Sequence, residues 1–128
     1  AEPMQSEDLR KLQNIAEEVE VVLCLEIVNR FEQYIANTAE EGIAICEEIN
    51  NPYCKLLLDT FHMNIEEDYI PDAIRAASDK GYLGYIHIGE ANRKIQMVKR
   101  KQILTGKQSQ KQSKILDMMD HLSWNHLC

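Results

Sequence analysis

Three short apolar runs, each preceded by a helical pattern, constrain the fold of this chain more than any other feature. The runs cover residues 21–28, 55–59 and 83–87, and the helical patterns cover residues 6–18, 38–49 and 69–80. An α-β-α-β-α-β order with short connections predicts parallel strands joined by crossover helices. Unbroken apolar runs are typical of strands buried on both faces of a sheet. We therefore predict an α/β fold with about three parallel strands.

A polar side chain that can bind a metal ion stands at the end of each run. Glu26 lies near the end of the first run, Asp59 ends the second and His87 ends the third. Parallel α/β folds bind their ligands at the carboxyl ends of the strands. Any one of these residues alone is more often a surface carboxylate or a core histidine. Three in succession predict a site for one divalent ion such as Mn²⁺, Mg²⁺ or Co²⁺.

Composition argues against several classes of protein. No apolar stretch reaches the roughly 18–20 residues of a membrane span, and the acidic N-terminus shows no signal peptide. We therefore expect a cytoplasmic protein with no membrane partner. The cysteines form no C-x-x-C pair, which favours reduced core thiols over a disulfide or a zinc site. They are Cys24, Cys46, Cys54 and Cys128.

Three sequence blocks resemble one enzyme family. Residues 25–32 read LEIVNRFE, residues 59–67 read DTFHMNIEE and residues 87–93 read HIGEANR. In this order and approximate spacing they resemble the signature blocks of the D-tagatose/D-psicose 3-epimerase family, and the resemblance extends over nearly all of residues 1–93. It implies the C-terminal half of a (β/α)8 TIM barrel, since such barrels need roughly 250 residues. The expected fold is thus a partial barrel followed by an irregular basic tail.

The resemblance also implies an activity and a set of site residues. The family interconverts ketohexoses such as D-fructose and D-psicose, or D-tagatose and D-sorbose, by proton transfer at C3 through an enediolate. It implies a ketose substrate, a divalent cofactor (Mn²⁺ first, with Co²⁺ or Mg²⁺ as alternatives) and a homo-oligomer in the full-length family. Glu26 would be both a metal ligand and one of two acid/base carboxylates. The other implied metal ligands are Asp59 and His87, and the implied substrate-binding residues are Glu32, His62 and Arg93.

The tail, residues 94–128, differs from the rest of the chain. It holds seven of the 14 Lys and Arg residues, two of the 21 Asp and Glu residues, and no glutamate. The family's fourth metal ligand, a glutamate in a Met-Glu-Pro-Phe segment that supplies the second acid/base carboxylate, is therefore missing. If the reading frame is shifted back by one base, the codons of residues 123–127 can encode that segment. This gives the hypothesis that the tail is frameshifted. The tail lacks the interleaved aromatic residues of a nucleic-acid-binding module, so we expect no nucleic-acid partner.

Two alternatives to the epimerase stay open. One is another isomerase of the same superfamily, such as a hydroxypyruvate isomerase, although residues 29–32 and 89–93 favour the epimerases. The other is a non-catalytic, truncated gene product. The missing carboxylate and the missing barrel strands both predict little or no turnover by this chain alone.

Overall fold

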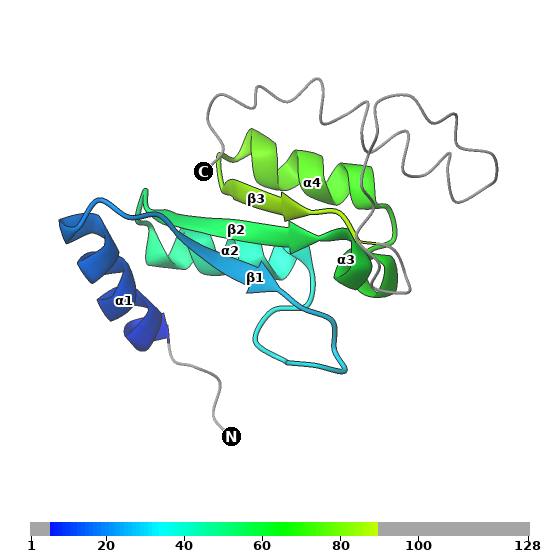
Figure 1. Ribbon diagram of the computed structural model, residues 1–128, viewed down its shortest axis with the longest axis horizontal. Helices are drawn as coiled ribbons and strands as arrows, with labels where there is room; N and C mark the ends of the chain where they lie inside the picture. The colour runs from blue at the N-terminus through cyan, green and yellow to red at the C-terminus, as the bar shows by residue number, and fades with distance from the viewer. Residues whose placement is uncertain (1–5, 90–128) are drawn as a thin grey trace.

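In the computed structural model, which describes residues 6–89, three parallel strands form one sheet (Figure 1). β1 (Leu23–Ile27) pairs with β2 (Cys54–Asp59), and β2 pairs on its other side with β3 (Leu83–His87). The helices of this part are α1 (Ser6–Glu18), α2 (Ala39–Ile49), α3 (Thr60–Glu66) and α4 (Ile70–Asp79). The strands run in one direction with helices between them, which confirms the predicted α/β fold.

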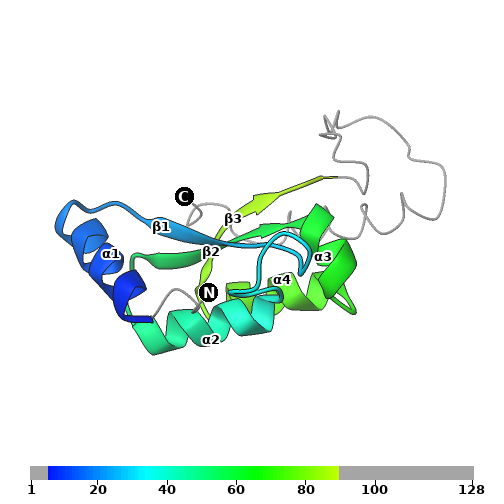
Figure 2. The ribbon, with the colours of Figure 1, turned by 90° about the horizontal axis from the view of Figure 1, so that it is seen from below.

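Helices α2 and α4 cover one face of this sheet (Figure 2). The side chains beneath them form the apolar core, because every second residue of a strand points to the same face. On β2 the buried residues are Cys54, Leu56 and Leu58, whereas the residues between them are only half-buried. The core is completed from the helices by Ile43, Cys46, Ile49, Met63, Ile70, Ile74 and Ala77.

The prediction that the strands are buried on both faces is wrong for residues 6–89. Ile27 is buried under the helices, whereas its neighbour Glu26 is exposed on the opposite face. In the same way Ile86 is buried and Tyr85 is exposed. No described helix covers that second face, so apolar residues there meet solvent within this part of the chain. A short apolar run cannot reveal whether a second layer is present.

The helix ends follow their local sequence. Thr38 caps α2, and its hydroxyl accepts the backbone N–H of Glu41, whose own carboxylate reaches back to the backbone N–H of Thr38. After α4, Gly81 takes a left-handed φ of 76°, as expected for a residue that ends a helix. After α1 the backbone N–H of Val21 bonds to the carbonyl of Ala16. Because Val21 belongs to this turn, β1 begins at Leu23 rather than at the predicted residue 21.

Two of the described cysteines, Cys46 and Cys54, lie in the core as predicted, whereas Cys24 does not. Cys46 and Cys54 are buried, with 3.6 Å between their sulfur atoms, and Cys24 is half-buried; none of these three residues is in a disulfide. Cys128 lies outside the described residues. Among residues 6–89 no helix has both the length and the apolar character needed to cross a membrane.

Gly42 packs closely against the sheet, on the face of α2 that covers β1 and β2. A Cβ atom built on Gly42 would lie 2.6 Å from Cδ1 of Ile27 and 3.0 Å from Cδ2 of Leu56. We expect Gly42→Val to lower the free energy of unfolding by ~1–3 kcal/mol, because the side chains of Ile27 and Leu56, or α2 itself, must shift to make room for the branched side chain. Urea unfolding followed by circular dichroism measures the change.

The matched control is Ala44→Val, on the exposed face of the same helix. It introduces the same β-branched side chain without the clash, and the lower helix propensity of valine than of alanine costs less than about 1 kcal/mol. Equal losses in the two variants would show that the approach of α2 to the sheet is not set by Gly42.

Candidate metal centre

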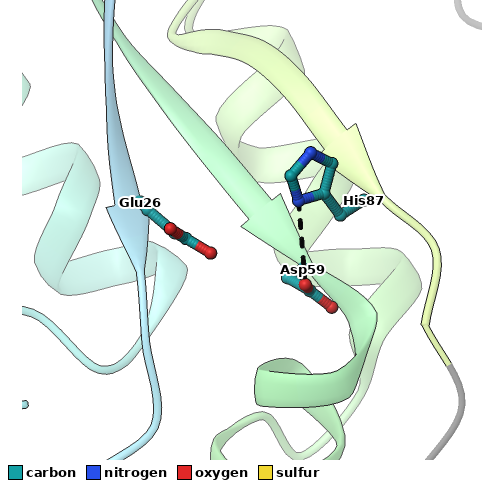
Figure 3. Close-up of side chains that lie close together, drawn as sticks. All are labelled: Glu26, Asp59 and His87. Atoms are coloured by element: carbon teal, nitrogen blue, oxygen red, sulfur yellow. Dashed lines mark ion pairs between the residues drawn. The ribbon is translucent and has the colours of Figure 1, made fainter. Parts of the chain in front are cut away.

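The carboxyl ends of the three strands bring Glu26, Asp59 and His87 together. Each residue offers one ligand atom, and these atoms all lie within 4.8 Å of one another. Figure 3 shows Glu26 on β1 and His87 on β3 at either side of Asp59, which ends β2. The sequence therefore predicted correctly which residues meet at this edge of the sheet.

The strand register explains the convergence. Asp59 stands opposite His87, and Glu26 stands opposite Leu57, two residues before Asp59 on the same strand. Residues two apart on a strand point to the same face, so Glu26, Asp59 and His87 all lie on the face that α2 and α4 leave open. A shift of one residue in either pairing would send one ligand into the core.

Asp59 is held by the helix that follows it. Its Oδ1 atom accepts the backbone N–H of Phe61 at 2.8 Å and so caps the N-terminus of α3. Its Oδ2 atom lies 3.8 Å from Nδ1 of His87. One carboxylate oxygen is therefore engaged in the helix cap, while the other faces His87 and remains available to a ligand.

His87 is positioned by its neighbours on β3 and α3. Its ring packs edge-to-face on Tyr85, with 5.3 Å between the ring centroids and 86° between the ring planes. Two residues later, the backbone of Gly89 exchanges hydrogen bonds of 2.9 Å with the hydroxyl of Thr60. These bonds tie the segment after β3 to the start of α3, next to Asp59.

The donor set fits a divalent cation. Two carboxylates held this close repel each other unless a positive charge lies between them. Carboxylate oxygens and an imidazole nitrogen suit Mn²⁺, Mg²⁺ and Co²⁺, and the absence of a thiolate in the cluster argues against a soft-metal site. His87 and Glu26 are exposed, so a bound ion would have coordination positions open to a substrate.

The other predicted site residues have different surroundings. His62 is buried on α3, where its Nδ1 atom meets Asn29, and it is not one of the clustered ligands. Glu32 is exposed on the connection between β1 and α2. Arg93 lies outside the described residues.

An ion pair that the sequence did not reveal fastens the connection between β1 and α2 to α3. The Arg30 guanidinium donates to both carboxylate oxygens of Glu66 at 2.8–3.2 Å, and the Arg30 backbone N–H donates to one of them at 2.6 Å. The Glu66 side chain is only 4% exposed. Because Arg30 lies between Glu26 and Glu32 in the sequence, this pair fastens the loop that carries Glu32 to α3.

The ion pair makes stability depend on pH. The hydrogen bonds from Arg30 hold the pKa of Glu66 below its ordinary value of 4.5. A lowered pKa stabilises the fold above the unfolded-state pKa, and this contribution is lost as the pH falls through the folded-state pKa. We therefore expect Glu66→Gln to lower the free energy of unfolding at about pH 7 and to have much less effect at about pH 3.

Urea titrations of both proteins at the two pH values measure this difference. Glu18→Gln, an exposed change on α1, is the control and should be neutral at both. An equal loss for Glu66→Gln at both pH values would mean that packing, rather than the ion pair, accounts for its effect.

Comparison with known proteins gives the family. The family model described as xylose isomerase-like TIM barrel matches residues 2–123. A D-psicose 3-epimerase from Enterocloster bolteae is 52% identical over 88 residues, which are 69% of this chain and 29% of that enzyme. An L-ribulose 3-epimerase from a Methylomonas species is 45% identical over 85 residues, or 66% of this chain and 29% of that enzyme.

A solved structure supports the same relationship. The D-psicose 3-epimerase from Clostridium cellulolyticum H10, solved with D-tagatose, superposes with a TM-score of 0.74 at 39% identity. The superposition covers 94% of this chain and 38% of that structure. In the two sequence relatives, the part that this chain matches is less than a third of their length. These comparisons confirm the resemblance that the three sequence blocks indicated, and the chain belongs to the xylose isomerase-like TIM barrel family.

Proposed function

We propose that this chain supplies the metal-binding half of a ketose 3-epimerase site. The observation that carries the proposal is the convergence of Glu26, Asp59 and His87 at the carboxyl edge of the sheet, with ligand atoms within 4.8 Å. The relatives that are 44–52% identical to this chain are epimerases of D-psicose and L-ribulose, both ketoses. A ketose is therefore the proposed substrate and Mn²⁺ the proposed ion, with Co²⁺ or Mg²⁺ as alternatives.

The proposed chemistry inverts one carbon centre. A base takes the C3 proton, the C–H electron pair forms a double bond between C2 and C3, and the π pair of the C2 carbonyl moves to its oxygen to give an enediolate. Return of a proton to the opposite face of C3 restores the C2 carbonyl and completes the inversion. The bound ion would polarise the C2 carbonyl and so make the C3 proton more acidic. Glu26, the carboxylate on the exposed face of β1, would accept the proton on one face as general base.

The remaining predicted residues would bind the sugar. Glu32 lies on the loop that Arg30 and Glu66 fasten to α3, and we propose that it accepts hydrogen bonds from sugar hydroxyls. His62 and Arg93 are proposed to donate to the oxygens that gain negative charge as the proton leaves. The free thiols of Cys46 and Cys54 are compatible with the proposed cytoplasmic location.

A second carboxylate is required on the opposite face of the sugar, and residues 94–128 contain no glutamate. We therefore propose that residues 1–93 form the part of the family's domain that this chain carries, and that residues 94–128 are a frameshifted tail, although the match to the family model extends to residue 123. By itself the chain would then bind the ion weakly and turn over little ketose. Genomic sequence across the codon of Arg93 tests the frameshift directly.

The proposed function can be tested in a chimeric enzyme, in which part of this chain is grafted into a complete relative. In the grafted enzyme, residues 6–93 of this chain replace the corresponding segment of the Enterocloster bolteae D-psicose 3-epimerase. We expect the grafted enzyme to bind Mn²⁺ and to interconvert D-fructose and D-psicose, whereas the 128-residue chain with Mn²⁺ gives no measurable turnover. A folded, Mn²⁺-loaded graft without turnover would contradict the proposed function.

A further inference from the structure

Asn29 is a buried polar residue for which neither the metal centre nor the sugar contacts account. It lies two residues beyond β1 and is 2% exposed. Its side chain has two partners, one on its own loop and one on α3. Its Oδ1 atom accepts the backbone N–H of Phe31 on the same loop at 3.0 Å. Its Nδ2 atom lies 2.7 Å from Nδ1 of His62 on α3.

These contacts fix the orientation of the Asn29 amide. A backbone N–H can only donate, so the atom that meets Phe31 must be the amide oxygen. The NH₂ group therefore faces His62, and it can only donate to Nδ1. Turning the amide over would point its NH₂ group at the Phe31 N–H and lose that hydrogen bond.

A further contact fixes the proton on His62. The backbone N–H of Asn29 also points at Nδ1 of His62, at 3.3 Å. With two donors directed at it, Nδ1 must be the unprotonated nitrogen that accepts. In a neutral imidazole the proton then resides on Nε2, because one ring nitrogen donates while the other accepts.

We infer that Asn29 is a positioning residue that holds His62 as the tautomer protonated at Nε2, so that His62 offers an N–H donor to a ketose oxygen. The donor role rests on the proposed function, whereas the tautomer rests on the contacts alone. The ring is also restrained by Phe61, which packs edge-to-face on it with 5.0 Å between centroids. Asn29 thus acts on the sugar through His62 and without touching it.

The tautomer can be measured without metal, sugar or activity. The full 128-residue chain is labelled with nitrogen-15 in its histidine rings and studied by NMR at about pH 8, above the ordinary histidine pKa. His62→Gln identifies the resonances of His62. We expect a single form in which Nδ1 resonates as an unprotonated nitrogen and Nε2 as a protonated one. A proton on Nδ1, or averaging of the two tautomers, would overturn the inference.

Asn29→Asp tests the part played by the side chain. The variant is nearly isosteric but replaces the NH₂ donor by a carboxylate oxygen, so the major form of His62 should gain a proton on Nδ1. Asn64→Asp is the matched control, because it adds the same charge at an exposed position of α3 and should leave the tautomer unchanged. A folded Asn29→Asp chain with the wild-type tautomer would overturn the inference. If the variant does not fold, the wild-type spectrum decides.

The grafted enzyme separates this inference from the proposed function. There Asn29→Asp should lower kcat/KM about tenfold, the cost of one hydrogen bond to the substrate, with unchanged Mn²⁺ content. Unchanged kcat/KM would overturn the donor role of His62. If the unmodified graft is inactive, the proposed function fails, while the NMR experiment still decides the tautomer.

Discussion

Replacing Glu26 by Gln in the grafted enzyme is expected to lower kcat for D-psicose by about 10²–10⁴-fold, the usual contribution of a general acid–base group. Glutamine keeps the size of the side chain and one ligand oxygen, but it cannot accept the C3 proton. Because Glu26 is also a proposed ligand, the assay is run at saturating Mn²⁺ so that weaker metal binding does not contribute. Glu26 is exposed at the end of β1, so the fold should tolerate the change.

The control for this prediction is Glu40→Gln, an exposed change in the first turn of α2 on the same graft. It should leave kcat within about twofold of the unmodified graft, since surface changes away from the site have small effects. Unchanged kcat for Glu26→Gln at saturating Mn²⁺ would assign proton transfer to another residue. Release of deuterium from C3-labelled ketose to solvent locates the affected step.

Asp59→Asn is expected to weaken Mn²⁺ binding to the 128-residue chain by about 100-fold or more, since even outer-shell changes at metal sites cost roughly 10–100-fold. This loss corresponds to about 2.8 kcal/mol of binding free energy. Asparagine is as good an N-cap as aspartate, so the bond to Phe61 that starts α3 is preserved. The variant therefore removes a ligand charge while leaving the helix in place.

Isothermal titration with Mn²⁺ measures the affinity, and circular dichroism checks that α3 and the rest of the fold are intact. Asp72→Asn is the control, because Asp72 lies on α4 outside the ligand cluster and forms an exposed ion pair with Arg75. Its Mn²⁺ affinity should equal that of the unmodified chain. Equal affinities for Asp59→Asn and the unmodified chain would show that Asp59 is not a ligand.

Much of the fold could be predicted because it is encoded locally. Alternation of helical patterns with apolar runs gave the strands and their parallel direction, and the cap at Thr38 and the turn at Gly81 follow from residue type. Helix α3 was not predicted, because seven residues are too few to show a helical period. The signal that could have revealed it is Asp59, an N-cap residue directly after a strand.

The metal centre was predictable for a topological reason, whereas its supports were not. Parallel strands place their carboxyl ends at one edge, so residues far apart in sequence, such as Glu26 and His87, had to meet. The contacts of Asn29 with His62 and of Arg30 with Glu66 join a loop to a helix 33–36 residues away. No periodicity encodes such contacts, since they depend on how the loop folds back over α3.

The most direct test of the metal centre is the location of the bound ion. Crystals of the 128-residue chain soaked in Mn²⁺ are measured at the manganese absorption edge, and an anomalous difference map is calculated. We predict a peak between the side chains of Glu26, Asp59 and His87, at roughly 2.0–2.3 Å from their ligand atoms. A peak elsewhere, or none at these residues in crystals that contain Mn²⁺, would contradict the account.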